Sequence, residues 1–137
     1  MSYGAAAALQ AAIYGRLTGH AALTDLVGDA IFDAIPAGAV PDLYVALGPE
    51  RARDRSDMTG RGARHDITIA VVSQAAGFAE AKAAAAAVSD ALVDADLALA
   101  RGSVVSLRFE RARAVRSGKN DERQIALTFR VRVDDGA

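Results

Sequence analysis

The sequence predicts an α+β fold: a mostly antiparallel sheet packed against a long alanine-rich helix and an N-terminal helix, with a long charged loop. Three observations support this prediction. Apolar residues recur with helical spacing near the start and again over residues 78–94. Two segments near the end, 104–115 and 122–133, alternate apolar and polar residues as strands do. No linker or repeat interrupts this order, so we expect one domain over residues 1–137.

The N-terminal helix is expected over residues 5–17. Leu9, Ile13 and Leu17 recur every four residues and therefore line one face of such a helix. Gly19 follows at a place where helices commonly end.

Three short elements are expected next. Residues 21–26 form a second helix that ends at Gly28. Residues 31–35 and 43–47 are rich in β-branched, aromatic and aliphatic side chains and predict two short strands, the first of which ends before Pro36.

A charged segment, Gly48–Arg64, separates the second of these strands from the next one. Connections in compact domains are usually about 4–6 residues long, and much longer loops without structure are commonly functional. The segment is almost free of apolar residues, so it cannot bury a core of its own. We therefore expect a flexible arm, about residues 48–65, that becomes ordered against a partner. Its candidate interface residues are Arg51, Arg53, Arg55, Asp57, Arg61 and Arg64.

The middle of the chain combines a strand with a helix. Ile67, Ile69 and Val71 alternate over residues 66–73 and predict a central strand. Residues 78–94 predict a helix whose alanines have the highest helix propensity and allow close packing. The apolar stripe of this helix consists of Phe78, Ala81, Ala85, Val88 and Leu92.

The last two strands are expected to pair as a hairpin with a β-bulge near Glu110–Arg111. Leu107 and Phe109 alternate in one phase, whereas Ala112 and Ala114 continue in the other phase. A single extra residue in one strand produces such a slip.

Four arginines on the outward face of this hairpin form a candidate interface. Guanidinium groups bind both carboxylates and phosphates. Of these two kinds of partner, we favour a protein with acidic residues. A solvated sheet edge and a nucleic acid stay as alternatives. Phe109 and Phe129 fall on the apolar face, so no aromatic platform for stacking bases is expected. The four residues are Arg111, Arg113, Arg130 and Arg132.

We expect no catalytic site, no metal site and no cofactor, and therefore no enzyme. The chain lacks cysteine, and neither His20 nor His65 has acidic or hydroxyl neighbours at ligand spacing. Both histidines are expected to be polar residues at element boundaries. Gly60–Gly62 resembles part of a phosphate-binding loop, but it lacks the following lysine and precedes a strand. No apolar run of about 18 residues is present, so no membrane span is expected.

Charge is distributed unevenly along the chain, although the formal net charge is only −1. Residues 1–50 contain a single basic residue, Arg16, whereas residues 101–132 contain eight arginines and Lys119. A head-to-tail contact between identical subunits would bring these halves together favourably. Simple exposure to solvent explains the distribution equally well.

Several segments, in this order, resemble the tail-terminator (tail-completion) proteins of long-tailed phages and of alphaproteobacterial gene transfer agents. They are Leu9–Leu17, Leu26–Pro36, Tyr44–Gly48, Asp54–Gly60, Phe78–Lys82 and Leu107–Arg111. The resemblance runs over nearly the whole chain, and the segments together are moderately specific.

The resemblance implies an α+β subunit without catalytic residues that assembles with itself into a hexameric ring. Such a ring caps the tail-tube protein, ends polymerisation of the tube and joins the tail to the head-side connector. DNA passes through its lumen without sequence specificity. The subunit is expected in the cytoplasm during assembly and then at the neck of a phage-like particle. Two alternatives are a head-side neck or stopper protein and, less favoured, a nucleic-acid-binding module.

Overall fold

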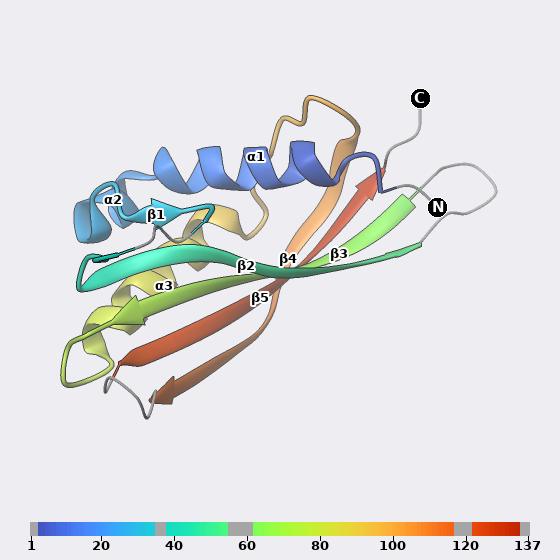
Figure 1. The fold of residues 1–137 in the computed structure, drawn as a ribbon. Coiled ribbons are helices and arrows are strands. Elements are labelled where there is room, and N and C mark those ends of the chain that lie inside the picture. The colour runs from blue at the N-terminus through green and yellow to red at the C-terminus, as the bar shows by residue number, and fades with distance from the viewer. Residues whose placement is uncertain (1–2, 35–37, 55–61, 117–121, 135–137) are drawn as a thin grey trace.

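The computed structural model describes residues 3–34, 38–54, 62–116 and 122–134. Three helices lie on one side of a five-stranded sheet (Figure 1), which confirms the α+β class. The helices are α1 (Ala6–Thr18), α2 (Ala21–Val27) and α3 (Ala79–Leu92), and the strands are β1 (Ile31–Phe32), β2 (Leu43–Asp54), β3 (Gly62–Ser73), β4 (Ser103–Arg116) and β5 (Arg123–Asp134).

The sheet has the order β1-β2-β3-β5-β4. β1 runs parallel to β2, and the three other pairs are antiparallel, as expected. β3 is the middle strand, and β4 lies at the edge opposite β1. The two faces of the sheet differ: the odd-numbered residues of β5, Ile125 to Val133, are buried toward the helices. We call this the helix face and the other the open face.

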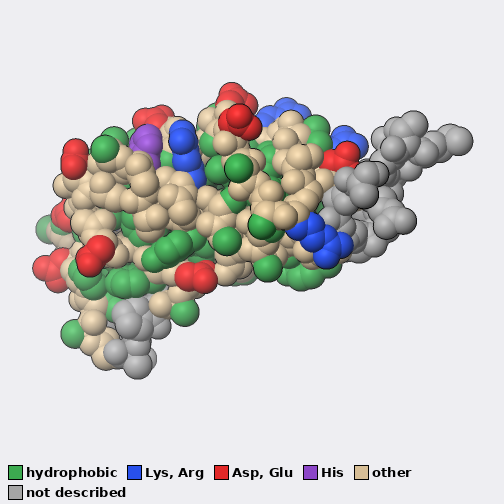
Figure 2. Space-filling model, turned by 90° about the horizontal axis from the view of Figure 1, so that it is seen from above, with side chains coloured by type: hydrophobic (Ala, Val, Ile, Leu, Met, Phe, Trp, Pro, Cys, Tyr) green, Lys and Arg blue, Asp and Glu red, His purple; other side chains and the backbone are tan. Residues whose placement is uncertain are grey.

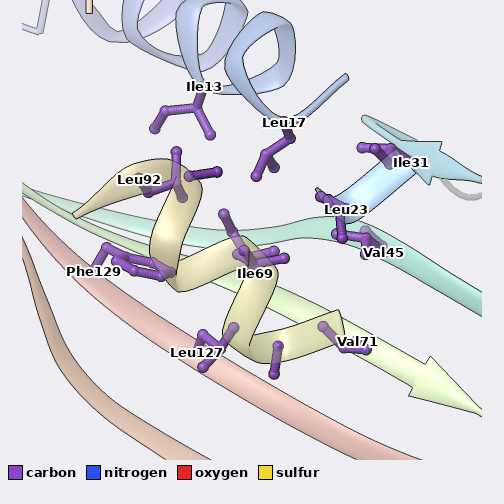
Figure 3. Packing of buried hydrophobic residues seen from close by; sticks show 14 of the residues in the cluster. Ile13, Leu17, Leu23, Ile31, Val45, Ile69, Val71, Leu92, Leu127 and Phe129 are labelled. Carbon is purple, nitrogen blue, oxygen red and sulfur yellow. The ribbon is translucent and has the colours of Figure 1, made fainter. Parts of the chain in front are cut away.

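Buried side chains from all three helices and the helix face form the core (Figure 3). Leu9, Ile13 and Leu17 of α1 are at most 1% exposed, which confirms the stripe expected from their spacing. Helix α3 buries Ala84, Val88 and other small residues, and its alanines allow it to lie close to the sheet.

The expected loop over residues 48–64 is wrong for most of its length. Gly48–Asp54 belong to β2 and Gly62–Arg64 belong to β3, so the two strands form one long ladder. Residues 55–61 lie outside the described residues. The open face carries no helix, so arginines on it remain compatible with strand pairing. The helix face of this segment carries Glu50 and His65 in place of aliphatic residues, so the alternation that marks a half-buried strand is absent here.

Two further strand predictions need correction. The first strand ends at Phe32, and Asp33 accepts a hydrogen bond from the side chain of Gln10 instead of continuing the ladder. In β4 the bulge near Glu110 is confirmed, but a second register shift lies between Val104 and Ser106. This second shift leaves Val105 61% exposed.

The first two helices end at glycines. Gly19 and Gly28 cap α1 and α2, as expected. No helix among the described residues combines the length and apolarity that crossing a bilayer requires.

Candidate interaction surfaces

The open face of the sheet gathers arginines from four adjacent strands, and we call this set the basic face. Cross-strand pairs establish it: Arg64 faces Arg132, Arg53 faces Arg64, and Arg108 faces Arg130. The same face carries the acidic residues Asp66, Glu110 and Asp134. The basic face consists of Arg51, Arg53, Arg64, Arg108, Arg111, Arg113, Arg130 and Arg132.

Two β-bulges direct these arginines to one face. In β2, one extra residue between Leu47 and Glu50 shifts the register, so Arg51 and Arg53 point away from the helices. Gly48 lies in this bulge, where an added Cβ atom would come within 3.1 Å of the Thr68 carbonyl oxygen. Bulges commonly redirect side chains in this way.

In β4, the shift between Phe109 and Arg111 has the same effect. Arg108 lies three residues before Arg111, an odd separation that places residues of a regular strand on opposite faces. The bulge at Glu110 puts both of them on the open face. Sequence reasoning located this bulge and the pairs Arg111/Arg113 and Arg130/Arg132, but it missed Arg108. The phase change of the apolar residues at the bulge is the signal in the sequence that could have identified Arg108.

Acidic residues hold part of the basic face in place. Arg64 donates two hydrogen bonds to the Asp66 carboxylate, at 3.2 and 3.0 Å. The hydrogen bond from Arg64, followed by the charges of Arg64, Arg130 and Arg53, lowers the pKa of Asp66. Arg130 donates to Glu110, and its buried Nε lies 3.7 Å from Oδ1 of Asp66.

A hollow of about 460 Å³ opens between β2 and β4 on this face. Arg51, Arg53, Arg64 and Arg111 line it together with Asp66. Arg51, Arg53 and Arg111 are exposed, and among the described residues none of them forms a bidentate pair like the one between Arg64 and Asp66. The hollow can therefore receive carboxylate or phosphate groups.

Seven of the ten residues expected at an interface lie on this one face. Arg55, Asp57 and Arg61 lie outside the described residues. The seven are Arg51, Arg53, Arg64, Arg111, Arg113, Arg130 and Arg132.

On the helix face, His65 contradicts its expected role as a polar boundary residue. It is 0% exposed, and its Nδ1 lies 3.2 Å from Oε2 of Glu50. The Tyr3 hydroxyl donates a 2.6 Å hydrogen bond to the other oxygen of Glu50. The start of α1 covers this end of the sheet (Figure 1). The side chains that lie there are polar, in place of an apolar core. No pattern in the sequence predicted that Tyr3, Glu50 and His65 lie together.

A second exposed surface, the acidic corner, lies at the β1 edge. We group under this name four exposed residues of α1, α2 and the turn before β1: Tyr14, Asp25, Leu26 and Asp29. Figure 2 shows acidic side chains predominating at the end of the molecule where α2 and β1 lie. Charge is therefore distributed asymmetrically in the folded molecule. Acidic residues lie at the acidic corner, and the arginines of β4 lie at the opposite edge of the sheet.

Within the described parts of the chain, no three His, Cys, Asp or Glu side chains lie close enough together to hold a metal ion. His65 contacts the Glu50 carboxylate and the ring of Tyr3, and in the part of the chain that the structure describes no contact places a serine or threonine hydroxyl beside it. The surfaces described here are suited to binding by charge and shape.

Comparisons with known proteins find clear matches to this chain. A model of the family described as Tail completion protein gp17 matches residues 11–134. Among solved structures, a chain in the virion of a native gene transfer agent (GTA) particle is 58% identical, with a TM-score of 0.91. The similarity covers 97% of this chain and 99% of that chain. No curated protein shows significant similarity.

Proposed function

Because the chain belongs to the Tail completion protein gp17 family, we propose that it caps the tail tube of a phage-like particle as an oligomeric ring. The ring ends polymerisation of the tube and joins the tail to the head-side connector. The observation that carries this proposal is the 58% identity, over 97% of the chain, to a chain of a native GTA virion. The role is structural, without catalysis or a cofactor.

The partners are further copies of the chain, the tail-tube protein and the head-side connector. The basic face supports contact with acidic protein surfaces, because its exposed arginines are preorganised on a rigid sheet. It also suits DNA that passes through the ring, since guanidinium groups bind phosphates whatever the base sequence. Assembly occurs in the cytoplasm, and the mature ring lies at the neck of the particle.

Deletion of the gene in a particle-producing cell tests the capping role. We expect tails of uncontrolled length and unjoined heads in negative-stain micrographs, because nothing would end the tube or connect it. A plasmid copy of the wild-type gene should restore joined particles of normal tail length. Normal particles in the deletion strain would contradict the proposal.

A head-side stopper is the alternative role in the same assembly. Co-sedimentation separates the two, since a terminator binds isolated tube ends whereas a stopper binds the portal or adaptor. Binding to the portal without binding to the tube would show that the chain acts as a stopper.

The basic face also supports a second candidate function, a nucleic-acid-binding module. Such a module loses affinity steeply as salt rises, because each neutralised phosphate releases counterions. Fluorescence anisotropy with duplex DNA at several salt concentrations tests it. Absence of binding at low salt would remove this candidate.

A further inference from the structure

We propose that the free edge of β4 packs against the acidic corner of a second copy of the chain. The inference rests on the proposed ring and names the two surfaces that would build it. Both surfaces combine exposed apolar side chains with charge, and the charges have opposite signs.

The β4 edge is one of these surfaces. β4 pairs with β5 alone among the described strands, so its other side is an edge of 14 residues. Val105 and Phe109 are 61% and 45% exposed on this strand. The Phe109 ring packs edge-on against the buried Phe129, with centroids 6.0 Å apart. It therefore extends the core outward to the surface.

Val93 adds to this apolar edge. It follows α3 and is 37% exposed. The backbone N–H of Asp94 donates to the Leu107 carbonyl, which ties this corner of the chain to β4. Arg108, Arg111 and Arg113 are exposed on the open face of the same strand.

The acidic corner provides the complement. Tyr14 and Leu26 are 37% and 45% exposed, and Asp25 and Asp29 flank Leu26 in the sequence. Six large hydrophobic side chains are exposed in the described chain, and five of them lie on these two surfaces. The sixth, Tyr3, has its hydroxyl bound to Glu50.

The geometry favours side-chain packing over addition of a strand. Register shifts at Val105 and Glu110 interrupt the regular spacing of β4, and arginines on an edge oppose pairing with another strand. A helical corner carrying carboxylates fits such an edge better. The two surfaces lie at opposite edges of one sheet and do not overlap, so each copy can use both at once. Heterologous contacts of this kind form a ring when the rotation between successive copies closes.

Reciprocal charge reversal tests the pairing in the full chain. Arg111→Glu/Arg113→Glu should weaken self-association by at least about tenfold in sedimentation velocity, since like charges then face each other. Asp25→Arg/Asp29→Arg should do the same. An equimolar mixture of the two variants, or all four changes in one chain, should restore assembly, because opposite charges face each other again.

Arg51→Glu/Arg53→Glu is the matched control, with the same change in charge on β2, which β3 and β5 separate from β4 in the sheet. It should self-associate like the wild type. Loss of assembly in this control as well would show that net charge matters and would overturn the pairing. Failure of the mixture and of the fourfold variant to regain assembly would also overturn it.

An engineered disulfide gives a second measurement that is independent of charge. The chain has no cysteine, so Leu26→Cys/Phe109→Cys can crosslink only through the introduced residues. We expect a ladder of covalent oligomers after mild oxidation, whereas each single variant stops at dimers. Dimers alone from the double variant would contradict the pairing.

The experiments can distinguish a wrong proposal of the ring from a wrong proposal of the interface. A wild-type chain that stays monomeric at every concentration, with and without tube ends, would overturn the ring and this inference together. A wild-type oligomer that tolerates both charge reversals would overturn only the interface.

Discussion

Glu50 and His65 lie side by side on the helix face of the sheet, with Oε2 of Glu50 3.2 Å from Nδ1 of His65. The two residues belong to neighbouring strands in the region where the sequence predicted a loop. Tyr3 packs on the histidine with ring centroids 6.1 Å apart, and its hydroxyl donates a hydrogen bond to Glu50. The chain start is therefore attached to the extension of β2 and β3.

Glu50→Ala should destabilise the protein by about 1–3 kcal/mol, because it removes the partner of a buried imidazole nitrogen. Tyr3→Phe removes one hydrogen bond from an exposed hydroxyl and should cost about 0.5–1 kcal/mol. Urea unfolding at neutral pH measures both. Equal losses in the two variants would show that the contact with His65 contributes nothing measurable.

Asp66 should make stability depend on pH. Its pKa is lower in the folded chain than in the unfolded chain, chiefly because Arg64 donates two hydrogen bonds to its carboxylate. The stabilisation is present above the unfolded value of about 4 and is lost as pH falls through the folded value. Asp66→Asn should therefore cost at most about 1 kcal/mol at pH 7.

Urea unfolding of the wild type and the Asn variant over a series of pH values provides the check. The difference in unfolding free energy should shrink as the pH falls below about 4. Asp42→Asn is a suitable control, because Asp42 is exposed and takes no part in the contact between Arg64 and Asp66. A difference for Asp66→Asn that stays constant with pH would contradict the assigned role of its charge.

Helices and apolar strands could be predicted because their signal is periodic. Leu9, Ile13 and Leu17 are buried as their spacing required, and the phase change after Phe109 correctly located a bulge. Both signals are local. Each depends on neighbours within one helix or one strand.

The extension of β2 and β3 could not be predicted in this way. Its helix face is filled by His65 and Glu50 instead of aliphatic residues, and its open face carries arginines. Besides its pairing with neighbouring strands, it is held by a contact with Tyr3, 47 residues before Glu50. The gathering of arginines on one face likewise depends on bulges and strand order, which a single strand does not reveal.

Gly28 should resist substitution, whereas Gly15 should not. Gly28 ends α2 with φ of 62° and ψ of −129°, a backbone conformation that side chains disfavour. Gly28→Ala should cost about 1–3 kcal/mol although the site has space for a methyl group. Gly15 lies inside α1, and an added Cβ meets no atom within 4 Å. Gly15→Ala should therefore stabilise by about 0.5–1 kcal/mol. Thermal unfolding measures both changes, and a neutral Gly28→Ala would show that the turn relaxes without strain.

The arginines beside the hollow should act on partners more than on self-association. Arg51→Ser/Arg53→Ser removes two exposed guanidinium groups, and we expect weaker co-sedimentation with tail-tube ends and fewer joined particles. Arg51→Lys/Arg53→Lys is the matched variant that keeps the charge. Because lysine lacks the bidentate geometry of arginine, it should recover only part of the binding if carboxylates are recognised in the hollow. Full recovery by lysine would indicate a contact that depends on charge alone. Normal joining by the serine variant would show that Arg51 and Arg53 are only solvated side chains.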